Sequence, residues 1–255
     1  RHYLRMTDET FDMINADLFL PYRRGAGSLY SLDHYEAAKK KLAPGGVYVQ
    51  WLPLFQITEN EFGIIARTML EAFGQVTMWR NNFQPGQDIV ALIGQVEPTP
   101  IPASPGSARE EMLAAVNQLN YRTVQPQMAA PETETITFYY AGNLTQARAL
   151  FADYPINTDD RPLIEYQTPR TFRQFAKEDV IWFVGPKFDA MVEAVLAASP
   201  IETDPALADR TAANRRLALA GRAFHRAMYL RVMGDHEASF AAWQEFLTQW
   251  RAGAD

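Results

Sequence analysis

Residues 11–51 constrain the fold more than any other part of this sequence. Two apolar strand patterns, at 11–18 and 47–52, flank a loop and one amphipathic helix. This alternation is typical of an α/β sheet. Asp17 lies where the first strand pattern ends, and open α/β sheets bind their ligands at the carboxyl ends of strands. We therefore take Asp17 as the first candidate for a working carboxylate.

Local signals set the boundaries within this segment. Residues 19–30 form a loop in which Gly25 and Gly27 permit tight turns. Ser31 is a candidate N-cap for the helix that follows, and Pro44-Gly45-Gly46 predicts its end. The apolar face of this helix is predicted to comprise Leu32, Tyr35, Ala38 and Leu42.

The next segment continues the alternation. Thr58 and Glu61 form a capping-box pattern before a helix with an apolar face. Two strand patterns follow, at 75–80 and 88–94, and Pro85-Gly86 between them predicts a hairpin.

Beyond residue 95 the signals are weaker. Residues 96–107 hold four prolines and predict a linker. For the remainder we expect a helix at 108–120, a strand at 136–141, a helix at 144–153, a polar loop at 156–170, a helix at 187–198, and two tail helices within 211–252 that are separated by Gly234-Asp235.

Composition excludes several classes of function. The net charge of −6 argues against nucleic-acid binding, which needs a basic face, and is compatible with a cationic ligand. The chain has no cysteine, so disulfides and thiolate chemistry are excluded. Its four histidines show no metal-ligand spacing, and we expect no metal site. No apolar run is long enough to span a membrane.

The segment around Asp17 resembles spermidine synthases, which are polyamine aminopropyltransferases. The family pattern Asp-x-x-Asp-Pro matches Asp17-Leu18-Phe19-Leu20-Pro21, and its Gly-x-x-Leu-Tyr pattern matches the residues up to Tyr30. The resemblance implies that Asp17 is the base acting on an attacking amine. It also implies that Tyr30, Gln50 and Trp51 bind substrate.

The sequence departs from this pattern at Leu20, where the family has a second aspartate that binds the amine. With Leu20 in place of a carboxylate, that side of the amine site is apolar. A compact diamine is then less favoured than a monoamine, a larger amine, or no amine at all. Asp17 also has a purely structural interpretation, since an aspartate that ends a strand often caps the following loop.

The donor half of such a site is missing from the sequence. No Gly-x-Gly-x-x-Gly follows a strand pattern. We therefore expect no cofactor to bind to this chain alone. The resemblance implies decarboxylated S-adenosylmethionine or S-adenosylmethionine only together with a missing N-terminal half, so that the sequence is a piece of a longer protein.

A second polar cluster comprises Asp159, Asp160 and Glu165. Its pattern resembles the Thr-Asp-Asp-x-Pro-x-x-Glu element of long bacterial synthase-like proteins with a membrane-embedded N-terminal region. These acids either hold a cation or cap turns and pair with Arg161 or Arg170, and we favour the structural role. The same resemblance implies a cytoplasmic location, with attachment to the inner membrane through a segment absent here.

The expected fold class is α/β: the C-terminal half of a Rossmann-like methyltransferase fold, then a mainly helical region with a tetratricopeptide-like hairpin. The predicted regions are 1–95 (synthase-like half domain), 96–107 (linker), 108–200 (mixed α/β extension) and 201–255 (helical hairpin).

Three functions stay open. The first is a synthase-like transferase acting on a small amine. The second is an inactive scaffold or accessory subunit of a membrane-associated complex, with a protein partner bound through residues 211–255. The third is a small-molecule methyltransferase. Self-association is compatible with each of them.

Overall fold

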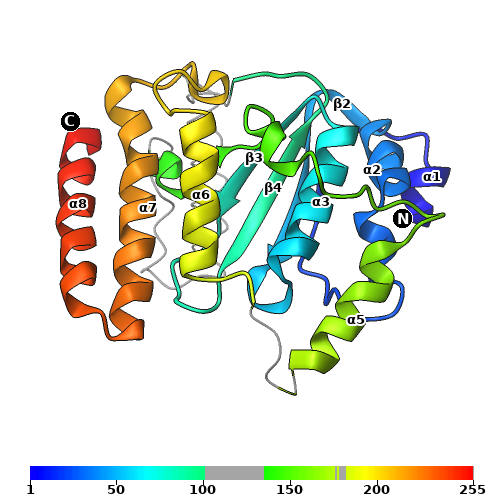
Figure 1. Ribbon diagram of the computed structural model, residues 1–255. Coiled ribbons are helices and arrows are strands. Elements are labelled where there is room, and N and C mark those ends of the chain that lie inside the picture. Colours follow the sequence, from blue (N-terminus) through cyan, green and yellow to red (C-terminus); the bar gives the residue numbers. More distant parts are fainter. Residues whose placement is uncertain (101–134, 176, 178–181, 255) are drawn as a thin grey trace, which may run out of the picture.

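The computed structural model describes residues 1–100, 135–175, 177 and 182–254. Its centre is a mixed five-stranded sheet with strand order β1-β2-β4-β3-β5 (Figure 1). The strands are β1 (Phe11–Ala16), β2 (Leu42–Pro53), β3 (Gln75–Arg80), β4 (Ile89–Gln95) and β5 (Tyr140–Asn143). The coarse expectation of an α/β fold is confirmed.

Strand direction divides the sheet into two parts. β1 and β2 are parallel, with Ala16 paired to Gln50, whereas β4 runs antiparallel to both β2 and β3. The predicted hairpin of β3 and β4 is confirmed. β1 and β2 are adjacent parallel strands joined by a crossover that contains α2, so their carboxyl ends lie at the same edge of the sheet, directly after Ala16 and near Trp51.

The helices lie on both faces of the sheet. The α-helices are α1 (His2–Met6), α2 (Leu32–Lys39), α3 (Glu59–Ala72), α5 (Leu163–Phe175), α6 (Pro186–Ala198), α7 (Ala212–Met233) and α8 (His236–Ala254). The short 3-10 helices are η1 (Ala26–Tyr30), η2 (Leu54–Gln56), η3 (Thr135–Tyr139), η4 (Arg148–Phe151) and η5 (Pro205–Leu207). The chain starts beside α2 and ends on α8, at opposite sides of the molecule (Figure 1).

Alternating strand residues build two cores. On one face, Tyr48, Met78 and Leu92 are buried in a cluster that also contains residues of α2, α3 and α6. On the other face, Val49 and Trp79 pack in a smaller cluster that includes residues of α7 and η5. The sheet is therefore covered on both sides, as α/β folds require.

The predicted helix starts are confirmed by hydrogen bonds. The Ser31 side chain accepts the backbone N–H of His34 at the start of α2. Thr58 and Glu61 form a complete capping box at the start of α3. Both signals are local in sequence, which explains why they could be recognised without the fold.

Several predicted boundaries are wrong. The polar loop expected at 156–170 ends at residue 162, and α5 begins at Leu163. In place of a helix over 144–153 there is the single 3-10 turn η4. The strand expected at 136–141 is divided between η3 and the later strand β5. α5 contains Pro169, and its contacts with loop 18–30 come from a distant part of the sequence.

The end of α2 is also earlier than expected. α2 ends at Lys39, and Leu42 belongs to β2 together with the glycine turn, where the β1–β2 register shifts. The helix expected at 108–120 lies outside the described residues, and the division of the chain into four regions stays a prediction. In the described ranges, no helix combines the length and apolar character needed to cross a bilayer.

Candidate functional site

Asp17 lies directly after β1, at the edge where the parallel strands end. Its side chain is exposed, and its Oδ1 accepts the backbone N–H of Leu18 at 2.7 Å. Among the described residues, no basic side chain forms an ion pair with it. One carboxylate oxygen therefore supports the loop, and the other remains accessible to a cation in solvent.

Trp51 lies closest to Asp17 in the strand pairing, because it follows Gln50, the partner of Ala16. Its indole Nε1 donates to Asn15 Oδ1 at 3.0 Å. This bond links β2 to β1 two residues before Asp17. Trp51 is partly exposed. The ring and the carboxylate thus belong to the same accessible edge of the sheet.

Gln50 and Tyr30 have a different environment, because both are fully buried. Gln50 Oε1 accepts the Tyr48 hydroxyl at 3.2 Å, and Gln50 Nε2 donates to the Trp51 carbonyl at 3.3 Å. The Tyr30 hydroxyl has no hydrogen-bond partner among the described residues, and burial raises the pKa of this phenol well above its ordinary value. A substrate could reach either side chain only after the loop or sheet edge moves.

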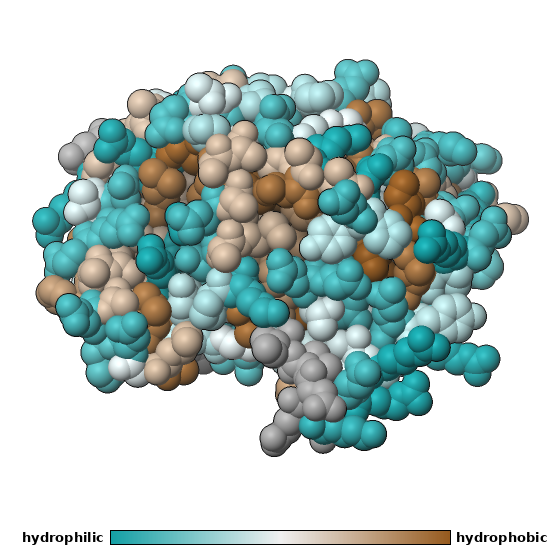
Figure 2. All heavy atoms as spheres, viewed as in Figure 1, coloured by the Kyte–Doolittle hydropathy of each residue, from teal (hydrophilic) through white to brown (hydrophobic). Residues whose placement is uncertain are grey.

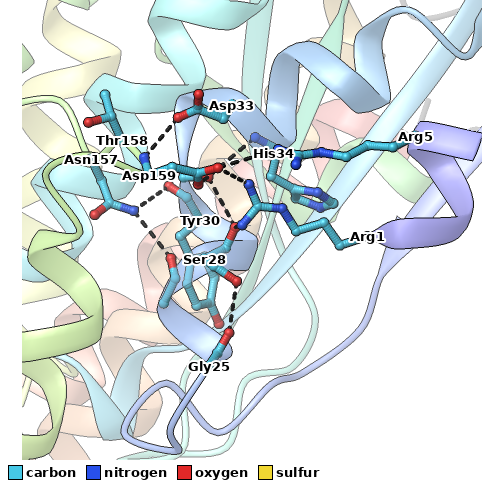
Figure 3. Close-up of polar contacts among 12 residues, drawn as sticks. Arg1, Arg5, Gly25, Ser28, Tyr30, Asp33, His34, Asn157, Thr158 and Asp159 are labelled. Atoms are coloured by element: carbon cyan, nitrogen blue, oxygen red, sulfur yellow. Dashed lines mark hydrogen bonds and ion pairs between the residues drawn. The ribbon is translucent and has the colours of Figure 1, made fainter.

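Asp159 forms an ion-pair cluster with the start of the chain. Figure 3 shows Arg1 and Arg5 reaching from the α1 region to its carboxylate. Ser31 Oγ donates to Asp159 Oδ1 at 2.8 Å, and the Asp159 backbone N–H donates to Asp33 at 2.8 Å. Partial burial opposes ionisation of Asp159, but the hydrogen bonds from Arg1 and Ser31 outweigh it, so its pKa lies below the ordinary value.

The other two acids of that cluster do not share the arrangement. Asp160 is exposed, with no hydrogen bond or ion pair within the described ranges. Glu165, in the first turn of α5, accepts the backbone N–H groups of Gly25 at 2.6 Å and Gly27 at 2.9 Å. The structure therefore does not bring the three carboxylates together, and no three potential metal ligands converge in the described part of the chain.

The expected pairing of these acids with Arg161 or Arg170 does not occur. The partners of Asp159 are Arg1 and Arg5 instead, because the segment before α5 lies against α1 and α2. Sequence spacing could not reveal these partners, since they lie more than a hundred residues away along the chain.

Two side chains to which the sequence assigned no separate role support the site. Asn157 is buried; its Nδ2 donates to the carbonyls of Gly27 at 3.2 Å and Tyr30 at 2.9 Å, and its Oδ1 accepts the Ile164 backbone N–H. Asn15 binds Trp51, as described above. The one available signal was residue type, because Asn commonly bonds to backbone groups in loops.

Comparison with known proteins does not supply a family. No family model matches this chain, and a search of the curated proteins finds no matching relative. The case for a function accordingly rests on the residues and on their geometry.

Proposed function

We propose that this chain is the amine-binding part of a spermidine synthase-like transferase, with Asp17 as the group that holds and deprotonates the amine. The observation that carries the proposal is the position of Asp17: an exposed carboxylate at the carboxyl end of β1, beside the end of the parallel strand β2, with no ion pair among the described residues. This is the edge at which α/β sheets bind ligands.

The chemistry requires such a carboxylate. A free alkyl amine has a pKa of about 10.4 and is mostly protonated at neutral pH. Asp17 would first attract the ammonium group and then accept its proton as the nitrogen attacks. The nitrogen lone pair forms a C–N bond to the donor's aminopropyl carbon while the C–S bond breaks, and the electron pair of that bond neutralises the sulfonium.

The strand order supports the finer fold assignment. A parallel pair followed by the antiparallel hairpin of β3 and β4 is compatible with the C-terminal half of a Rossmann-like methyltransferase sheet. The proposal therefore requires a donor-binding part from outside these 255 residues. Leu20 favours a monoamine or a larger amine over a compact diamine, because one carboxylate holds one ammonium group.

The first prediction concerns Asp17 in the full-length protein. Asp17→Asn should reduce amine-dependent turnover by about 100-fold or more, the usual contribution of a general base. The matched control is Asp12→Asn, since Asp12 is an exposed aspartate on the same strand. Steady-state turnover of both variants, at equal amounts of folded protein, tests the assignment; equal rates for Asp17→Asn and the wild type would refute it.

A second candidate, an accessory subunit, is favoured by the tail. Val232, Met233 and Phe240 are 72%, 64% and 65% exposed around the α7–α8 turn. Figure 2 shows apolar side chains at the end of the molecule that this hairpin forms. Because α7 also contributes to the core, Phe240→Ser is a cleaner probe than deletion of the tail. A partner that co-purifies with the wild type and is lost from Phe240→Ser would support this candidate.

A further inference from the structure

The loop after Asp17 is held by a segment far away in the sequence. Residues 18–30 contact α5, and the hydrogen bonds between them join residues about 140 positions apart. Few local backbone bonds hold this loop by itself: Arg23 N–H donates to Leu20, and Ala26 N–H donates to Arg23. α5 therefore holds this loop together with Asn157, which lies before α5 and binds the carbonyls of Gly27 and Tyr30.

Glu165 makes the central contact. Each carboxylate oxygen accepts one backbone N–H, Oε1 from Gly25 and Oε2 from Gly27. Gly25 has φ of +88°, a left-handed conformation that glycine adopts without strain and that turns the loop toward α5. Bonds to an ionised acceptor are stronger than those between neutral groups. With both oxygens engaged, Glu165 is a ligand of the loop rather than of a cation.

Further contacts reinforce the same junction. The Thr168 hydroxyl donates to the Pro21 carbonyl at 2.7 Å, and the rings of Tyr22 and Phe172 stack with centroids 3.7 Å apart. A Cβ on Gly27 would lie 2.4 Å from the backbone nitrogen of Glu165, so only glycine permits this approach.

α5 is itself fixed to the core. The Thr171 hydroxyl donates to Glu61 at 2.7 Å, and Asn60 donates to Gln167 at 3.2 Å, which joins α5 to the first turn of α3. α5 thus connects α3, which contributes buried residues to the core, to the loop that follows Asp17.

We propose that Glu165 is a positioning residue that fixes loop 18–30 in the conformation needed beside Asp17. This inference rests on the proposed amine transfer for its consequence in catalysis, but the positioning itself can be tested without any activity. Without the Glu165 carboxylate, Gly25 and Gly27 lose their acceptor, and the loop samples open conformations in which amine binding is weakened.

Trypsin provides the direct test, because Arg23 and Arg24 are exposed in this loop and the Arg24–Gly25 bond contains the N–H that Glu165 binds. Proteolysis requires local opening of the segment. Glu165→Gln should accelerate cleavage after Arg23 and Arg24 by about tenfold or more, the change that follows from losing one charge-assisted hydrogen bond. Cleavage sites are identified from peptide masses.

The matched control is Glu71→Gln, which neutralises a carboxylate in an exposed pair with Arg67 on α3. It should leave cleavage at Arg23 and Arg24 unchanged. Gly27→Ala provides an independent variant from the loop side and should accelerate the same cleavage. Both Glu165→Gln and Gly27→Ala should leave the cleavage rate at Lys39–Lys41 unchanged, which separates local release from unfolding. Equal rates at Arg23 and Arg24 in Glu165→Gln and the wild type would overturn the inference.

Kinetics of the full-length protein then test the catalytic consequence. Glu165→Gln should raise KM for the amine by about tenfold with a smaller change in kcat, whereas Asp17→Asn should reduce kcat and leave loop cleavage unchanged. If Asp17→Asn retains full turnover, the proposed function fails while the proteolysis result still stands. If the loop is released and KM does not change, the positioning role in catalysis is refuted.

Discussion

Asp17 and Asp159 show how position decides what a carboxylate can do. Asp159 receives Arg1, Arg5 and Ser31, so its charge is already compensated within the fold. Within the described part of the chain, Asp17 accepts a hydrogen bond only from the backbone N–H of Leu18, and its side chain is exposed. A cationic substrate would have to displace a protein partner at Asp159 but not at Asp17. This difference is the reason for assigning the chemical role to Asp17 and a structural role to Asp159.

His34 leads to a prediction about pH. It is 4% exposed at the start of α2, and its pKa is lowered to about 4 by burial first and then by nearby positive charges that include Arg1 and Arg5. In the unfolded chain the ordinary pKa is about 6.5, so the unfolded state takes up a proton first as pH falls. The stability present above about pH 6.5 is therefore lost between about pH 6.5 and about pH 4, by up to about 3 kcal/mol.

Urea unfolding at a series of pH values measures this effect. His34→Gln should remove this part of the dependence of the free energy of unfolding on pH, since glutamine does not titrate. His236→Gln is the control, because His236 is exposed in the first turn of α8. A slope that is the same in wild type and His34→Gln would contradict the account of His34.

At the scale of helices and strands, the elements that could be predicted are those with local sequence signals. The strand around Phe11–Ala16, the capping box of α3 and the β3–β4 hairpin were recognisable from apolar spacing, capping residues and the Pro-Gly turn. α5 was missed, because Pro162 and Pro169 and a polar composition suggest a loop. α5 makes contacts with loop 18–30 and with α3, and contacts between distant residues cannot be read from a local pattern.

The candidate site divides in the same way. The position of Asp17 at a strand end followed from local pattern alone, and the structure places it there. Burial of Tyr30 and Gln50 was not predictable, because it depends on α2, α3 and α5 closing over the sheet. The role of Glu165 at the loop could not be derived from spacing, since its partners lie near residue 26.

The junction of α7 with the sheet is testable at this scale. Asp88, just before β4, binds His225 of α7 at 2.6 Å through Oδ1 and accepts the Gly185 backbone N–H at 3.0 Å through Oδ2. Both Asp88 and His225 are buried. Asp88→Asn should lower the free energy of unfolding by about 1–3 kcal/mol, because a buried donor loses its charged acceptor.

The control for this prediction is Asp153→Asn, an exposed aspartate near η4. Chemical denaturation of both variants compares them directly. Equal stability of Asp88→Asn and Asp153→Asn would show that the Asp88–His225 contact does not hold α7 on the sheet.

At the scale of the whole molecule, one edge of the sheet collects the features that matter for function. β1 and β2 end there, Asp17 is exposed there, and α5 reaches that edge from a distant part of the chain (Figure 1). The net charge of −6 is compatible with a cationic substrate at this edge. These features are the ones on which the proposal of an amine substrate rests.

The most direct test of this account is the mass of the product that the full-length protein forms from an amine. The amine is incubated with decarboxylated S-adenosylmethionine and, in parallel, with S-adenosylmethionine, using the wild type and Asp17→Asn. We expect a gain of one aminopropyl group with the first donor in the wild type and almost none in Asp17→Asn. A gain of one methyl group with the second donor would identify a methyltransferase, and no Asp17-dependent gain with either donor would contradict the account.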